Sequence, residues 1–188
     1  RSIQVLDRVT AARALNVTMP DSVKMVAYES NNAPTNAGSK AWDKKTGLLL
    51  ADRVLYSSVH YPANYGFIPQ SYCDDGDPLD VLVLCQEPIT PLCMVECKAI
   101  GVITMRDEKG QDDKIIAVHA HDPAYNSYHD ISALPPHVIK ELQRFFEDYK
   151  ILEHKEVIVD SLRGRVDAVN SIKDALKLYR KMESELKE

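Results

Sequence analysis

Apolar residues recur at helical spacing in two segments of the C-terminal third of the chain. The first follows Pro135 and Pro136, a favoured helix start, and its apolar stripe consists of Val138, Leu142, Phe145, Phe146 and Tyr149. The second covers about 168–185, and its stripe consists of Val169, Ile172, Leu176, Tyr179 and Met182. Both patterns predict amphipathic helices whose apolar faces pack against the rest of the protein.

The middle of the chain carries short apolar or alternating runs instead. The strand-like segments are 48–59, 80–84, 94–105, 114–120 and 156–164, and 61–69 is predicted to be extended but irregular because of its prolines and glycine. The polar segment 106–113 is predicted to be a hairpin loop. Short, mainly antiparallel strands with two covering helices predict an α+β protein, with the strands forming a small barrel.

Small and polar residues separate these elements near the N-terminus. Segment 30–39 is predicted to be a loop and 43–47 a turn. Residues 1–22 show only weak helical periodicity and are interpreted as an N-terminal extension, a candidate for docking on a partner. Residues 23–188 are predicted to form a single domain.

Composition narrows the classes of function. The chain has 188 residues, a net charge of −5 and a pI of about 5.7, which disfavours nucleic acid and anionic membranes as partners. No apolar run approaches the roughly 20 residues of a membrane-spanning helix. The four cysteines are interpreted as reduced thiols of an intracellular protein. A cytoplasmic location is expected. The alternative is a mitochondrion or plastid after removal of a transit peptide. Such peptides are rich in arginine, and the first residues of this chain include Arg1, Arg8 and Arg13.

Four aspartates crowd the start of the buried run 80–84: Asp74, Asp75, Asp77 and Asp80. Crowded carboxylates share protons or hold cations, and their hard oxygens favour Mg²⁺, Mn²⁺ or Ca²⁺. A calcium-binding helix–loop–helix site is excluded, because Asp80 stands where such a loop requires glycine. For this motif alone, an ordinary turn with an Asp–Pro signal is the competing interpretation.

Other residues indicate that the protein binds phosphate groups and transfers them to water. Asp107, Asp112 and Lys114 lie on the predicted hairpin, and side chains of phosphate-binding type occur at Arg53, Tyr61, Tyr65, Tyr149 and Lys150. Carboxylates that hold metals, combined with cationic and hydroxyl donors, are suited to transferring a phosphoryl group to water.

The chain resembles the soluble family I inorganic pyrophosphatases, most of all their plant-like members. The family signature matches Asp75-Gly76-Asp77-Pro78-Leu79-Asp80-Val81. The resemblance continues in "ADRVLYSSVHYPANYGFIP" (51–69), "MRDEKGQDDKIIAV" (105–118) and "RFFEDYK" (144–150), and covers roughly 42–180. It implies a closed five-stranded barrel of the oligonucleotide-binding type with two helices. It also implies Mg²⁺-dependent hydrolysis of pyrophosphate to two phosphates, with several ions per active site.

The resemblance also implies roles for individual residues. Asp75, Asp80 and Asp112 would hold one metal, with Asp80 shared by a second, and Asp107 together with Asp112 would hold a third. Asp77 would accept the proton of the attacking water. The phosphates would be bound by Arg53, Tyr65, Lys114, Tyr149 and Lys150.

One segment departs from the family pattern. Family members usually carry a phosphate-binding Lys and a metal-binding Glu at the positions of Ser39 and Ala41. Lys40 is one place away and would face the other side of a strand. A further family acid is matched by Glu29 only if the loop carries an inserted residue. These departures lead to the hypothesis that turnover is impaired.

Three functions follow as alternatives. The first is a working inorganic diphosphatase, with full turnover or with turnover that is impaired by these departures. The second is a catalytically weak relative that serves as a structural or regulatory subunit of a larger assembly. The third, a binder of single-stranded nucleic acid, is disfavoured by the acidic character of the chain. Pyrophosphate is the expected partner, and the sequence leaves open whether the chain forms a homo-oligomer.

Overall fold

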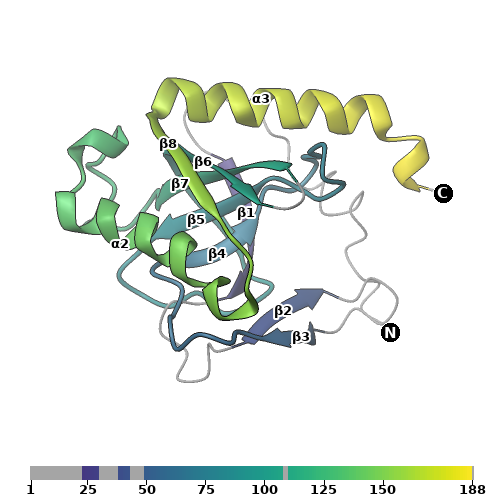
Figure 1. Ribbon diagram of the computed structural model, residues 1–188. Helices are drawn as coiled ribbons and strands as arrows, with labels where there is room; N and C mark the ends of the chain where they lie inside the picture. Colours follow the sequence, from purple (N-terminus) through teal and green to yellow (C-terminus); the bar gives the residue numbers. More distant parts are fainter. Residues whose placement is uncertain (1–22, 30–37, 43–48, 108–109, 188) are drawn as a thin grey trace.

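The computed structural model describes residues 23–29, 38–42, 49–107 and 110–187 (Figure 1). The strands are β1 (Val23–Glu29), β2 (Gly38–Trp42), β3 (Leu49–Val54), β4 (Asn64–Phe67), β5 (Asp80–Leu84), β6 (Met94–Asp107), β7 (Gly110–His119) and β8 (Ile158–Gly164). The helices are α2 (Pro136–Asp148) and α3 (Arg165–Met182), and short 3₁₀ turns lie at Ile131–Ala133, Ile151–Glu153 and Glu185–Lys187.

The main sheet is mixed, with the strand order β1-β4-β5-β7-β6-β8. Strand β1 pairs with β4 and also with β6, while β2 and β3 form a separate two-stranded sheet. Only the β5–β7 pairing is parallel among the pairings described. In Figure 1, α3 crosses the top of the sheet, α2 lies at its side, and β2 and β3 lie below. The predicted combination of mainly antiparallel strands with two helices is confirmed.

Apolar side chains from the two faces of the strands form two clusters. Leu82 and Leu84 of β5 belong to the cluster that includes Leu142 and Phe146 of α2. The alternate residues Val81 and Val83 belong to the cluster that includes Ala168 and Ile172 of α3. Strand β5 is therefore buried on both faces, which is the reason for its unbroken apolar run. Each large side chain buried in this way contributes about 1.5–3 kcal/mol.

Strand β6 bends where it passes from one neighbour to the next. Its register with β7 shifts between Ala99 and Gly101, and Gly101 also pairs with Gly164 of β8. A Cβ atom at Gly101 would lie 2.7 Å from the Cβ atom of Ile131, so the close approach requires glycine. The long predicted strand is thus confirmed, and its bend follows from a local shift in pairing.

Both predicted helices are confirmed, with the start and the end of the second one three positions earlier than predicted. Helix α2 begins at Pro136 as expected, and buries Leu142, Phe145 and Phe146. Helix α3 begins at Arg165, three positions before the predicted start. The Arg165 N–H donates to Oδ2 of Asp130 at 2.8 Å, so a carboxylate distant in sequence stabilises the helix start.

The predicted hairpin loop at 106–113 was wrong. Strand β6 continues to Asp107 and β7 begins at Gly110, so Asp112 and Asp113 pair with Met105 and Thr104 inside the ladder. Polar sequence suggested a loop, but the strand pairing and partners on neighbouring elements hold these residues in a regular strand.

Two other predictions near the N-terminus were wrong, and one strand was missed. Segment 64–67 is a regular strand between β1 and β5, and Gly38 and Ser39 are the first residues of β2 and not the end of a loop. Strand β1 was not predicted. The predictions for 1–22, 30–37 and 43–48 lie outside the described residues.

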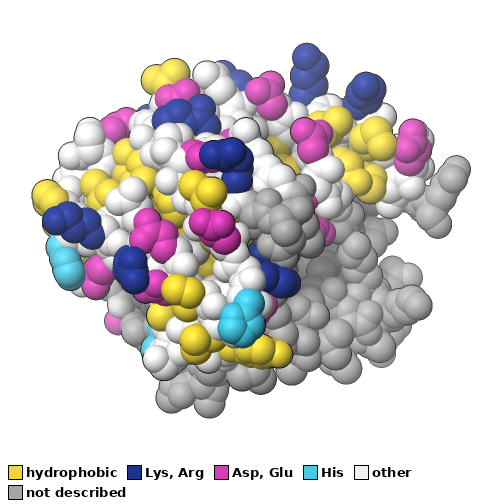
Figure 2. Space-filling view, in the orientation of Figure 1, with side chains coloured by type: hydrophobic (Ala, Val, Ile, Leu, Met, Phe, Trp, Pro, Cys, Tyr) yellow, Lys and Arg dark blue, Asp and Glu magenta, His cyan; other side chains and the backbone are white. Residues whose placement is uncertain are grey.

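The molecular surface carries charges of both signs. On the face shown in Figure 2, acidic and basic side chains are interspersed and hydrophobic side chains are scattered between them. No helix in the described part of the chain is long and apolar enough to cross a membrane.

Candidate active site

Parallel pairing of β5 and β7 brings together two acids and a lysine that are far apart in sequence. Asp80 lies opposite Lys114 in the ladder, and Asp112 lies two residues earlier on the same face of β7. The Lys114 ammonium donates to Oδ2 of Asp80 and lies 2.7 Å from Oδ2 of Asp112. Lys114 is only 5% exposed, so this cation is held between two carboxylates inside the protein.

The electrostatics of this cluster favour a charged lysine. Burial alone would lower the pKa of Lys114, but the carboxylates of Asp80 and Asp112 outweigh it and raise the pKa above its ordinary value. Burial raises the pKa of Asp112, although the neighbouring Lys114 opposes this effect. The opposite charges of the lysine and the acids therefore stabilise one another where little water reaches them.

Tyr65 completes the contacts of Asp80. Its hydroxyl donates to Oδ2 of Asp80 at 2.6 Å, the same oxygen that accepts from Lys114. Burial, followed by the charge of Asp80, raises the pKa of Tyr65. The tyrosine consequently stays neutral and acts as a hydrogen-bond donor at this position.

The acidic loop before β5 is held by hydrogen bonds at its base. The Ser71 hydroxyl accepts from the Leu79 N–H at 2.8 Å and donates to the Ile68 carbonyl at 2.5 Å. Within the loop, Gly76 has a φ of 86°, a conformation that side chains rarely adopt. The loop therefore has a defined shape that places its carboxylates at the start of β5.

Aspartates from the loop, from β5 and from β7 line one cavity of about 510 Å³. The predicted ligands Asp75, Asp80 and Asp112 are among its lining residues. Asp77 is exposed and is not among them, but its N–H donates to Oδ1 of Asp75 at 3.1 Å. The structure thus brings three predicted ligands to one cavity, and the predicted proton acceptor contacts one of them, Asp75.

A series of aromatic rings connects this cluster to the end of α2. The ring centroids lie 4.9 Å apart for Tyr65 and Tyr61, 4.6 Å for Tyr61 and Phe145, and 5.5 Å for Phe145 and Tyr149. The ammonium of Lys150 lies 5.4 Å from the centroid of the Tyr149 ring. Such packing restricts the rotamers of the tyrosines.

Tyr149 and Lys150 lie in the same electrostatic environment as Lys114. Both residues are 8% exposed. Burial raises the pKa of Tyr149, and the positive charges of Lys150 and Lys114 act in the opposite direction. The structure therefore brings the end of α2 close enough to the β5–β7 cluster for the charges to interact.

Several predicted site residues are placed only by their backbone. Glu29 pairs with Tyr65 at the end of β1, Arg53 pairs with Ser39 in the β2–β3 sheet, and Asp107 ends β6. The register of β2 with β3 shifts between Ser39 and Lys40. The predicted directions of these side chains, including that of Lys40, lie outside the described structure.

The cavity offers oxygen ligands of the kind that Mg²⁺ requires. Carboxylate oxygens are the ligands that this hard cation prefers, and the cavity offers them from Asp75, Asp80 and Asp112. Among the described residues, however, no three His, Cys, Asp or Glu side chains converge closely enough to form a metal group as they stand. The ammonium of Lys114 lies between two of the acids. The residues therefore fit a divalent cation in the chemistry of their oxygens, while in this structure Lys114 contacts two of the acids.

Sequence reasoning missed the contribution of α3 to this cavity. Ser171 and Asp174 line it from the helix, together with Gln111 and Asp113 of β7. Residues 171 and 174 share one side of a helix, but the amphipathic pattern indicated only the apolar side. No local signal could reveal which strand the polar side would meet.

Comparison with known proteins identifies the family. The sequence model of the family described as inorganic pyrophosphatase matches residues 33–180. The chain belongs to the inorganic pyrophosphatase family. The resemblance inferred from the sequence is thereby confirmed.

Plant and algal relatives support the same assignment. Soluble inorganic pyrophosphatase 2 of Chlamydomonas reinhardtii is 58% identical over 137 residues, which are 73% of this chain and 71% of that protein. A soluble inorganic pyrophosphatase of Solanum tuberosum is 56% identical, and the matched region is 65% of its length. The match thus spans slightly less than two thirds of the potato relative.

Solved structures of bacterial family members share the fold. An inorganic pyrophosphatase from Thermus thermophilus is 37% identical with a TM-score of 0.81, covering 87% of this chain and 94% of that one. One from Helicobacter pylori is 36% identical with a TM-score of 0.81, covering 88% and 98%. The fold described above therefore extends across distant relatives.

Proposed function

We propose that the chain is an inorganic diphosphatase that hydrolyses pyrophosphate to two phosphates and depends on Mg²⁺. The observation that carries the proposal is the cluster of Asp80, Asp112 and Lys114 at an acidic cavity of a family member. Partly buried acids offer ligands for cations, and a lysine held beside them offers a donor for phosphate. The relatives matched above are named for the same activity.

Four of the predicted aspartates would supply ligands for Mg²⁺. Asp75, Asp80 and Asp112 would hold Mg²⁺ at the cavity, and Asp107 would add a ligand from the end of β6. When bound, Mg²⁺ would neutralise phosphate charge and lower the pKa of a coordinated water, so that this water loses its proton more readily. Asp77, whose N–H donates to Asp75, would accept the proton of the attacking water.

Basic and hydroxyl side chains would bind the phosphates. Lys114 contacts Asp80 and Asp112, two acids that line the cavity, and Tyr65 donates to Asp80. Tyr149 and Lys150 lie at the end of α2, and Arg53, a residue of β3, would join them in binding phosphate. These donors orient the substrate and counter the charge that develops as a phosphoryl group leaves.

The proposal also covers the closure of the sheet, the division of the chain and the location of the protein in the cell. The two pairings of β1, with β4 and with β6, support a closed five-stranded barrel of the oligonucleotide-binding type. Residues 23–188 are proposed as one domain and 1–22 as an extension that docks on a partner. We assign the protein to the cytoplasm. Imaging of the full-length protein would distinguish this location from a mitochondrion or plastid.

Phosphate release from pyrophosphate by the purified protein tests the function. We expect activity that requires Mg²⁺, disappears in excess chelator and is inhibited by Ca²⁺, which uses similar ligands with looser geometry. Full activity in excess chelator would contradict the metal dependence. A folded protein without activity in Mg²⁺ would favour the alternative, a weakened subunit that acts within a larger assembly. Size-exclusion chromatography with light scattering would then show whether the chain forms a homo-oligomer.

A further inference from the structure

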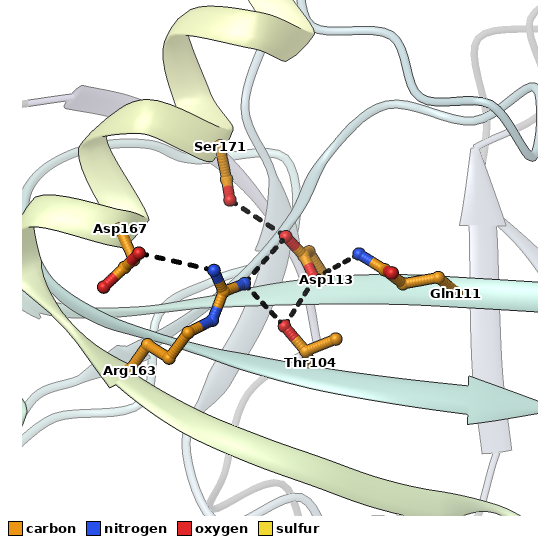
Figure 3. Close-up of polar contacts among 6 residues, drawn as sticks. All are labelled: Thr104, Gln111, Asp113, Arg163, Asp167 and Ser171. Carbon is orange, nitrogen blue, oxygen red and sulfur yellow. Dashed lines mark hydrogen bonds and ion pairs between the residues drawn. The ribbon is translucent and has the colours of Figure 1, made fainter.

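A network of polar side chains surrounds Asp113, next to the candidate site in sequence. It joins four elements: Thr104 of β6, Asp113 of β7, Arg163 of β8 and Ser171 of α3 (Figure 3). Gln111 and Asp167 lie at its edges, with Gln111 donating to Asp113 at 3.5 Å and Arg163 donating to Asp167 at 3.4 Å. Segments distant in sequence thus meet at one carboxylate.

Both oxygens of Asp113 are engaged. Oδ1 accepts from the Thr104 hydroxyl at 2.8 Å, and Oδ2 accepts from the Ser171 hydroxyl at 2.9 Å. Arg163 donates to the Thr104 oxygen at 2.8 Å and lies 3.7 Å from Oδ2 of Asp113. Because donors on two different elements hold the two oxygens, the network fixes both the position and the orientation of the carboxylate.

The position of Asp113 in β7 gives this network its significance. Asp112 and Lys114, its neighbours on either side, face the cluster with Asp80, whereas Asp113 points to α3 and β8 (Figure 3). Asp113 also lies three residues from Gly110, where β7 begins. Strand ends open more readily than strand centres, so a tie to a helix at this point restricts the part of β7 that carries the site.

We propose that Asp113 is a positioning residue, which Ser171 and Thr104 hold so that α3 sets the placement of Asp112 and Lys114. The inference rests on the proposed function, since it assigns Asp112 to a divalent cation and Lys114 to phosphate. A small displacement of a ligand weakens binding strongly, because cation coordination depends on geometry. Loss of the tie should therefore weaken cation binding more than it weakens the fold.

The sharpest variant is Ser171→Ala, because it removes one hydrogen bond without changing any charge. Ser171→Thr retains a hydroxyl and should restore the wild-type behaviour. Asp113→Asn keeps the shape of the side chain but places an amide nitrogen among donors. The matched control is Asp160→Asn, since Asp160 accepts two hydrogen bonds at 2.6 Å from Arg106 without touching β7 or α3 in any contact described.

The experiment measures the affinity of the protein for Mn²⁺ alone, and the electron paramagnetic resonance signal of the free ion reports how much Mn²⁺ is unbound. Thermal melts of the metal-free proteins show whether each variant is folded. Mn²⁺ replaces Mg²⁺ because both prefer oxygen ligands. We expect about 10-fold weaker binding for Asp113→Asn, at the lower end of the effect of residues that orient ligands. Ser171→Ala should weaken binding several-fold, while Ser171→Thr and Asp160→Asn bind as the wild type does.

Each outcome decides the inference. Wild-type affinity in a folded Ser171→Ala protein overturns it, as does equal weakening in Asp160→Asn. A wild-type protein that binds no Mn²⁺ overturns it too. If the wild type binds Mn²⁺ and the variants lose affinity, but pyrophosphate is not hydrolysed, the positioning role stands and the proposed function fails. If pyrophosphate is hydrolysed and Ser171→Ala binds normally, only the positioning role fails.

Discussion

At the scale of single residues, the site depends on a lysine held between acids. Lys114 is buried, and Asp80 and Asp112 have about a fifth of their side-chain surface exposed, at 23% and 22%. A buried charge whose partner is removed is strongly destabilising, because neither water nor another ion replaces the lost interaction. The metal-free protein therefore relies on Lys114 to hold the two carboxylates together.

The variant Lys114→Met should expose that dependence. We expect the metal-free variant to lose about 3 kcal/mol of stability, at the lower end for removing one partner of a buried pair. Mg²⁺ should raise the melting temperature of the variant more than that of the wild type, because it binds the acids only in the folded state. Thermal melts in chelator and in Mg²⁺ measure this. Lys140→Met, which changes an exposed lysine of α2, is the control, and an equal Mg²⁺ response in all three proteins would contradict the prediction.

The proton-acceptor role of Asp77 gives a second prediction at this scale. Asp77→Asn should keep the fold, because the side chain is exposed and its backbone makes the contacts of the loop. An amide cannot take the proton, and loss of a general base typically lowers the rate by about 10²–10⁴. Turnover of pyrophosphate at saturating Mg²⁺ measures the effect. A rate close to that of the wild type would refute the assignment.

At the scale of elements, the parallel alignment of β5 with β7 and the tie from α3 bring the site together. Strand β2 carries Ser39 and Ala41, which the sequence resemblance predicts to stand where family members usually carry Lys and Glu. Ser39 pairs with Arg53, a predicted phosphate-binding residue, and Ala41 pairs with Leu50. The departure thus falls on the strand beside a predicted substrate contact.

Restoring the family residues should raise activity. We predict that Ser39→Lys with Ala41→Glu increases kcat/KM for pyrophosphate, since a hydrogen bond to a charged group contributes about 1.5–3 kcal/mol. The two changes should act more than additively, because the glutamate recruits a cation and the lysine contacts the substrate that this cation binds. Steady-state kinetics of both single variants and the double variant provide the measurement. If none of the three gains activity while the fold is intact by thermal melt, the alignment of this strand is wrong.

At the scale of the whole molecule, the two faces of the strands have separate roles. One face buries apolar residues beneath α2 and ends in the cluster of Asp80 and Lys114, while the other packs on α3. Carboxylates outside the site hold the loops that connect these layers. Asp122, 6% exposed, is one of them, and Asp130, which accepts from the Arg165 N–H at the start of α3, is another.

Acid should weaken the fold through these carboxylates. Burial alone would raise the pKa of Asp122, but hydrogen bonds from the N–H groups of Gln86 and Ala124 lower it to about 2. The folded-state pKa lies below the ordinary value of 3.8, so the stabilisation is complete above that value and is lost as the pH falls toward 2. Lowered pKa values at Asp130 and Asp160 act in the same direction.

Urea unfolding at pH 6 and pH 3 measures this dependence. The wild type should be clearly less stable at pH 3, and Asp122→Asn should be destabilised at pH 6 but show a smaller loss between the two values. The control is Asp174→Asn, which changes an acid of α3 for which no such set of hydrogen bonds is described. Identical pH dependence in the wild type and Asp122→Asn would contradict the prediction.

The sequence by itself determined the features whose information is local. The apolar run of β5, the stripes of α2 and α3, and the signature from Asp75 to Asp80 could all be interpreted from spacing and residue type. The family, and with it most of the candidate ligands, followed from the same short blocks. These features need no knowledge of which segments meet.

Only the tertiary structure decided which segments meet, because strand pairing and register depend on contacts distant in sequence. Lys114 lies opposite Asp80 through the parallel alignment of β5 with β7, which no local pattern indicates. The polar segment around Asp113 is a strand and not a loop, since partners on β6 and α3 satisfy its side chain. Polar residues predict a loop when they are seen alone, and they form ordered structure when other elements supply their hydrogen-bond partners.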